Sequence, residues 1–113
     1  MSFPTSKSAM RHIVMWNVAG TTTEEKADAI AHIRREFEAL RGSIPGMTFL
    51  EIGEDTSGAS YACDVVLVTE FDSQDALDAY ASHPAHLAVR GRLEGIRIAR
   101  HQVDYAVGPS KVA

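Results

Sequence analysis

The chain has 113 residues, a length that suits one domain with one modest hydrophobic core. Its net charge of −4 argues against a nucleic-acid-binding surface, and no apolar run is long enough to predict a transmembrane helix. A single cysteine, Cys63, excludes an intramolecular disulfide and the cysteine-rich zinc motifs.

Residues 1–10 carry neither the apolar core nor the cleavage pattern of a signal peptide, so we expect a disordered leader and a cytoplasmic protein. A strand is predicted over residues 11–18, where β-branched and aromatic residues precede Gly20. Alternation places four side chains on one face of this strand: His12, Val14, Trp16 and Val18. The other face carries Ile13 and Met15, so both faces are partly apolar.

A helix is predicted after this strand. Thr22 and Glu25 have the spacing of a capping box, in which each side chain bonds to the backbone N–H of the other residue. An apolar stripe follows at spacings of three and four residues: Ile30, Ile33, Phe37 and Leu40. We expect Gly42 to cap the end of this helix, and Ile44-Pro45-Gly46 to turn the chain into a second strand over residues 47–52.

The second half of the chain repeats the order strand, helix, strand. A polar loop is expected over residues 53–60, and the strongest strand signal of the chain follows over residues 63–71. Asp72 and Ser73 supply an N-cap for a short helix, and Pro84 suits the first turn of another.

A last strand is predicted over residues 98–107, with Gln102, Asp104 and Ala106 on one face. The order β-α-β-β-α-β is the ferredoxin-like arrangement of an α+β domain, an antiparallel sheet with helices on one face. We expect this domain to span residues 11–107 and residues 108–113 to form a flexible tail.

The uncovered face of such a sheet is predicted to be apolar, because Ile13 and Met15 of the first strand point away from the helices. An apolar face of this kind usually marks an interaction site. Two such sheets packed face to face would bury it, so the sequence predicts a homodimer through the open sheet face.

Short motifs occur in a fixed order from residue 11 to residue 107: Arg11-His12-Ile13-Val14, Ile44-Pro45-Gly46, Glu51-Ile52-Gly53, Phe71-Asp72-Ser73, Tyr80 with His83-Pro84-Ala85-His86, and Val103-Asp104-Tyr105. In this ordered set the chain resembles the Dabb family, the stress-responsive dimeric α/β-barrel domain. The resemblance implies a ferredoxin-like dimeric α/β barrel, which agrees with the fold predicted from the residues.

The resemblance also implies a candidate site. Some family members look like stress-induced plant proteins, and others are polyketide cyclases without a cofactor, in which a tyrosine and the second histidine of H-P-x-H are the catalytic pair. Those positions are Tyr80, as the acid, and His86, as the base. A histidine near the start of the first strand lines the cyclase cavity, and His12 matches it. The remaining ligand contacts are expected from His83, Val14, Trp16, Phe37 and Ile33.

Three functions remain open at this point. The first is an enzyme without a cofactor that acts on a small apolar or aromatic carbonyl compound. The second is a binding protein that uses the same cavity without turnover, and the third is a structural or stress-related dimer. We predict no metal site, although two weaker candidates exist: the histidines His12, His83 and His86, and the acidic residues Glu51, Glu54 and Asp55.

Overall fold

The computed structural model describes residues 8–108. Residues 1–7 of the predicted leader and residues 109–113 of the predicted tail lie outside these residues. The predicted leader extends to residue 10, but residues 9 and 10 belong to the first strand, where they pair with neighbouring strands. Seven elements follow in the order β1 (Ala9–Val18), α1 (Thr23–Glu38), β2 (Met47–Glu54), β3 (Val65–Phe71), α2 (Gln74–Ala81), α3 (Pro84–Arg92) and β4 (Arg97–Val107).

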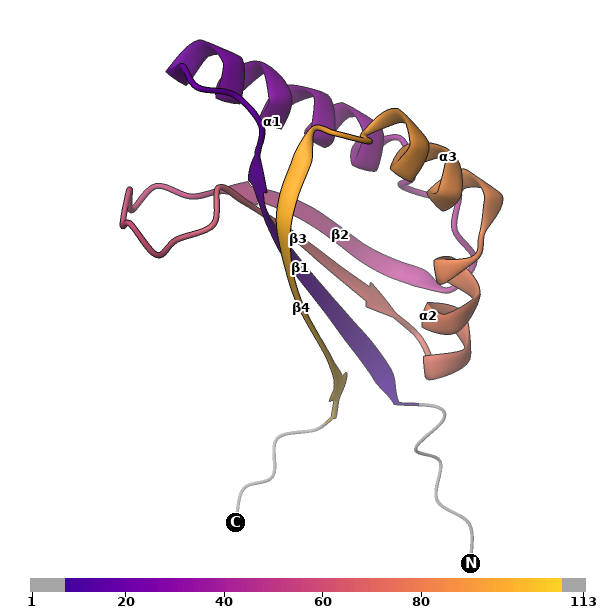
Figure 1. Ribbon diagram of the computed structural model, residues 1–113. Coiled ribbons are helices and arrows are strands. Elements are labelled where there is room, and N and C mark those ends of the chain that lie inside the picture. The colour runs from indigo at the N-terminus through magenta and orange to yellow at the C-terminus, as the bar shows by residue number, and fades with distance from the viewer. Residues whose placement is uncertain (1–7, 109–113) are drawn as a thin grey trace, which may run out of the picture.

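The four strands form one antiparallel sheet in the order β2-β3-β1-β4. All three helices lie on one face of this sheet, and the loop between β2 and β3 extends away from its end (Figure 1). The predicted ferredoxin-like fold is therefore confirmed, with the second helical segment divided into α2 and α3.

Helix α1 begins as predicted and ends earlier than predicted. Thr22 is the N-cap and completes a capping box with Glu25. The helix ends at Glu38, four residues before the expected cap at Gly42. Its last turn tightens, because the N–H groups of Leu40 and Arg41 bond to carbonyls three residues back, and this change ends the α-helical pattern.

The core lies between the helices and one face of the sheet. On β1, the side chains of the predicted inner face are all buried: His12, Val14, Trp16 and Val18. On β3, every second residue from Val65 to Phe71 is buried in the same way. Ile30, Ile33 and Phe37 of α1 close the core from the helix side, so the predicted faces of β1 and α1 are confirmed.

Strand β4 departs from simple alternation at Ala99. Trp16 pairs with Arg100 and Asn17 pairs with Ile98, so Ala99 is an extra residue in a β-bulge and has a left-handed φ of 53°. Residues 97 and 100 would lie on opposite faces of a regular strand. The bulge places Arg97 opposite Val18 and Arg100 opposite Trp16, both of which face the helices.

The other face of the sheet has no helix over it. Met15 is 37%, Tyr105 39% and Val103 51% exposed, and Val103 pairs with Ile13 across the β1–β4 ladder. Arg11 lies on the same face, where it donates to Glu70 and to the Tyr105 hydroxyl. Within residues 8–108, no helix is long and apolar enough to cross a membrane.

Gly46 and Gly42 provide a matched test of packing at the start of β2. Both have a left-handed φ, +80° and +81°, but a Cβ on Gly46 would lie 2.5 Å from Ala76 Cβ, whereas a Cβ on Gly42 meets nothing within 4 Å. Each Ala substitution carries the left-handed penalty of about 1–2 kcal/mol. We expect Gly46→Ala to lose a further ~1–3 kcal/mol in urea unfolding, because β2 and α2 must separate. Equal losses in the two variants would contradict this packing.

Candidate functional site

Two neighbouring cavities lie between the helices and the β1–β4 edge of the sheet. The smaller one, here called the histidine cavity, has a volume of about 260 Å³. It is lined by His12, Leu77, Asp78, Tyr80, Ala81, His86, Arg90, Arg100, Gln102 and Asp104. The structure therefore brings His12, Tyr80 and His86 together, from β1, α2 and α3.

The break between α2 and α3 positions Tyr80 and His86. His83 is the N-cap of α3, and its Nδ1 accepts a hydrogen bond of 3.0 Å from the Ala85 N–H. Pro84 occupies the first turn, where a missing N–H has no cost. The new helix carries the His86 ring back over Tyr80, and the two rings stack with centroids 4.1 Å apart.

The Tyr80 hydroxyl is buried without a hydrogen-bond partner among the described residues. Tyr80 is 3% exposed, and burial raises its pKa to about 12. The phenol therefore keeps its proton at neutral pH. A buried hydroxyl with no partner is costly, and this phenol has a proton that it can donate to an acceptor placed within hydrogen-bond distance.

His86 is held as a neutral base. Its Nδ1 lies 3.1 Å from the Tyr80 carbonyl oxygen, which can only accept, so Nδ1–H is the donor and Nε2 keeps the free lone pair. Burial lowers the pKa of His86, and the positive charges of Arg90 and Arg97 lower it further. The imidazole is therefore neutral at pH 7 and able to take a proton.

His12 forms a second polar pair, with Asp104 of β4. His12 Nδ1 lies 2.6 Å from the Asp104 carboxylate, which also accepts from Gln102. A carboxylate bonded to Nδ1 fixes the orientation of the ring and leaves Nε2 as the nitrogen for other contacts. Sequence reasoning missed Asp104, because only the register of β4 on β1 places it opposite His12.

The other predicted ligand residues have different positions. Val14, Ile33 and Phe37 are packed in the core and line neither cavity. Trp16 stacks on Phe37 with ring centroids 5.7 Å apart, and it lines the second cavity. His83 acts as a helix cap. Ligand contacts of these five residues therefore stay predictions.

The candidate metal ligands are not gathered into a site. Among residues 8–108, no group of three or more His, Cys, Asp or Glu side chains is placed to hold a metal ion. In the acidic loop, the Asp55 carboxylate accepts hydrogen bonds from Ser57 and from the Gly58 N–H, which lower its pKa. That carboxylate thus has a structural task in the loop.

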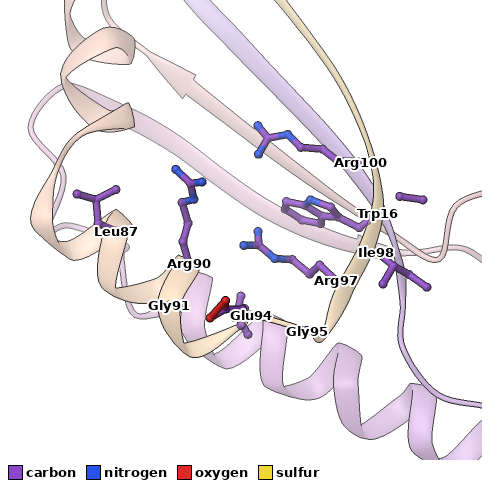
Figure 2. Close-up of a pocket in the computed structure, with 11 residues that line it drawn as sticks. Trp16, Leu87, Arg90, Gly91, Glu94, Gly95, Arg97, Ile98 and Arg100 are labelled. Atoms are coloured by element: carbon purple, nitrogen blue, oxygen red, sulfur yellow. The ribbon is translucent and has the colours of Figure 1, made fainter.

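The larger cavity, here called the arginine cavity, has a volume of about 590 Å³ and shares Arg90 and Arg100 with the walls of the histidine cavity. Figure 2 shows Arg90 reaching into it from α3, while Arg97 and Arg100 reach in from the start of β4. Sequence reasoning missed these three residues, because two of them share a face only through the bulge at Ala99.

Comparison with known proteins identifies the fold and a family. Residues 10–107 match the family model of Dabb, described as the stress responsive A/B barrel domain. No curated protein is significantly similar to the chain in sequence.

Solved structures of similar proteins cover nearly the whole domain. A dimeric protein of unknown function with a ferredoxin-like fold from Bacteroides fragilis is 28% identical, covers 88% of this chain and 96% of its own, and has a TM-score of 0.77. A dimeric ferredoxin-like protein of unknown function from Thermobifida fusca is 25% identical, covers 88% of this chain and 92% of its own, and has a TM-score of 0.75. The hydroxynitrile lyase of Passiflora edulis is 15% identical, covers 93% and 98%, and has a TM-score of 0.76, a likeness of fold alone.

The titration of His86 tests the electrostatics of the histidine cavity. We expect its imidazole signals in NMR to titrate below the ordinary pKa of 6.5, because burial disfavours the charged ring. The unfolded chain then binds this proton at a higher pH, so His86 lowers the stability of the fold as the pH falls below 6.5. The imidazole signal that is lost in His86→Gln is assigned to His86. A pKa at 6.5 would show that the ring is solvated, and a pKa above 6.5 would show that it is paired with an acid.

Proposed function

The chain belongs to the Dabb family, and on that premise we propose that it is a homodimeric small-molecule-binding protein that transfers protons on a carbonyl substrate without a cofactor. The observation that carries the proposal is the unpartnered Tyr80 hydroxyl in a cavity that also holds the neutral His86 imidazole. A donor and a base in one cavity are the two groups that such chemistry needs.

The proposed step begins with His86 as the base. Its Nε2 takes a proton from the carbon next to a carbonyl, and the electrons of that C–H bond form an enolate. The Tyr80 hydroxyl donates a hydrogen bond to the enolate oxygen, where charge develops. The enolate then recovers the proton from His86, or its carbon attacks a second carbonyl of the same substrate and closes a ring. In the second case the attacked carbonyl becomes an alkoxide, and this oxygen takes the proton from His86, as in an aldol-type cyclase.

The histidine cavity sets the size and character of the substrate. Its volume of about 260 Å³ suits a small compound or one part of a longer one. Leu77 and Ala81 give it apolar wall, which supports a small apolar or aromatic carbonyl ligand. The His12–Asp104 pair completes the polar side and positions the ligand relative to Tyr80.

The homodimer is proposed to form through the open face of the sheet. Three structural neighbours are described as dimeric at 25–28% identity, and the open face of this chain carries exposed Met15, Val103 and Tyr105. Packing two copies on this face would hide the apolar side chains and leave the helix face, with its cavities, unobstructed. The free thiol of Cys63 is consistent with a cytoplasmic location, which we include in the proposal.

A charge on the open face tests the dimer. We expect Val103→Glu to be a monomer in analytical ultracentrifugation, because the face-to-face packing would bury the new carboxylate without a partner. The matched control is Leu87→Glu, a similarly exposed apolar residue of α3 at 47%. A Val103→Glu protein that sediments like the wild type would place the interface elsewhere.

Exchange of carbon-bound protons tests the chemistry without a known substrate. We expect the protein to accelerate deuterium incorporation into 1-phenylpropan-2-one in D₂O, followed by NMR. His86→Ala and Tyr80→Phe should each slow this exchange by roughly 100-fold, the usual effect of losing a general base or an oxyanion donor. His32→Ala is the control, because His32 lies on α1, pairs with Glu36 at 3.6 Å and lines neither cavity. Equal rates in all four proteins would refute the assigned roles.

A further inference from the structure

The arginine cavity holds an unusual excess of positive charge. Of its lining residues, Arg90, Arg97 and Arg100 are cationic and Glu94 is the one acid. Among residues 8–108, none of these three arginines forms an ion pair with a carboxylate. Five other basic side chains in the same part of the chain do have a carboxylate oxygen within 4 Å: Arg11, His12, His32, Arg41 and Arg92.

Nearby acids are engaged elsewhere. Asp78 and Asp104 line the adjoining histidine cavity, where Asp78 accepts from Gln74 and Asp104 accepts from His12 and Gln102. Glu94, the acid of the arginine cavity itself, makes no ion pair within 4 Å among residues 8–108, and Arg100 donates to the uncharged Gln102 side chain. The three positive charges therefore have no carboxylate partner in this part of the chain.

The fold holds these arginines close to one another at a cost. Ala99 adopts a left-handed φ of 53°, which is unfavourable for a residue with a Cβ, and the bulge that it makes brings Arg97 and Arg100 to one face. The Arg97 guanidinium lies over the Trp16 ring at 4.7 Å, which fixes its position. Burial lowers the pKa of Arg97, and the charges of Arg100 and Arg90 lower it further, so the group gains from a negative partner.

We propose that the arginine cavity binds the oxyanion of the ligand, a carboxylate or a phosphate group, while the uncharged carbonyl end of the same molecule enters the histidine cavity. The placement of the carbonyl in the histidine cavity rests on the proposed function. One molecule can reach both cavities, because they share Arg90 and Arg100 in their walls. Guanidinium groups donate paired hydrogen bonds that match both oxyanions. The substrate class is therefore a small keto acid or keto phosphate.

The single tryptophan of the chain reports on this cavity directly. Trp16 is the only tryptophan, and it lines the arginine cavity beside Arg97. We expect its fluorescence to saturate on titration with phenyl phosphate or benzoate and not with benzamide, their uncharged counterpart. Comparing the first two probes, together with inorganic phosphate, distinguishes a phosphate site from a carboxylate site.

Removal of one cation provides the matched variants. Arg90→Gln and Arg100→Gln should each weaken binding of the preferred anion by about tenfold or more, since a hydrogen bond between charged groups is lost. Both side chains are exposed, so the fold should tolerate the change. Arg35→Gln on α1 has the same change in net charge and should bind like the wild type.

The outcomes separate this inference from the proposed function. Anion binding by the wild type and by Tyr80→Phe, in a wild-type protein that does not accelerate ketone exchange, would support the oxyanion site and refute the chemistry. Ketone exchange by a protein whose Trp16 fluorescence does not respond to the anions would support the chemistry and refute the oxyanion site. If neither phenyl phosphate nor benzoate binds more tightly than benzamide, or if Arg35→Gln weakens binding as much as Arg90→Gln and Arg100→Gln do, the inference is overturned.

Discussion

The pairing of β1 with β4 is the interaction on which the candidate site depends. The register places Asp104 opposite His12, so a carboxylate from the end of the chain orients a histidine from its start. The same ladder contains the bulge at Ala99, which turns Arg97 and Arg100 toward the helices. Since β4 is an edge strand that no helix covers, its inner face is open to a ligand where a central strand would be packed.

The two faces of the sheet differ because helices cover only one of them. Three helices cover the β2-β3-β1 part of one face and bury a continuous core of aliphatic and aromatic side chains. The break at His83 and Pro84 lets α3 continue this cover toward β4 without sealing it, and the two cavities occupy that space. The opposite face keeps exposed apolar side chains, and in the proposed dimer a second sheet would bury them, so the proposed assembly and the proposed ligand binding use different surfaces.

The sequence was sufficient for the fold, because local signals agreed with one another. The capping box at Thr22, the proline at the start of α3 and the strong strand signal over residues 63–71 each predicted the element that the structure contains. The helix end at Glu38 was placed too late, since hydrogen bonds to carbonyls three residues back leave no mark in the sequence. In the site, motif resemblance brought out His12, Tyr80 and His86. Asp104 and the arginines were missed, because strand register and a bulge are properties of pairing and not of local sequence.

The central claim is that one molecule spans the two cavities, with a carbonyl oxygen at Tyr80 and an oxyanion at the arginines. A crystal structure of the protein with 3-benzoylpropionate, a stable keto acid, tests it most directly. The account predicts a keto oxygen about 3 Å from the Tyr80 hydroxyl oxygen and a carboxylate on Arg90 or Arg100. A Tyr80 hydroxyl bonded to a protein group instead, with the keto acid bound elsewhere or not at all, would contradict it.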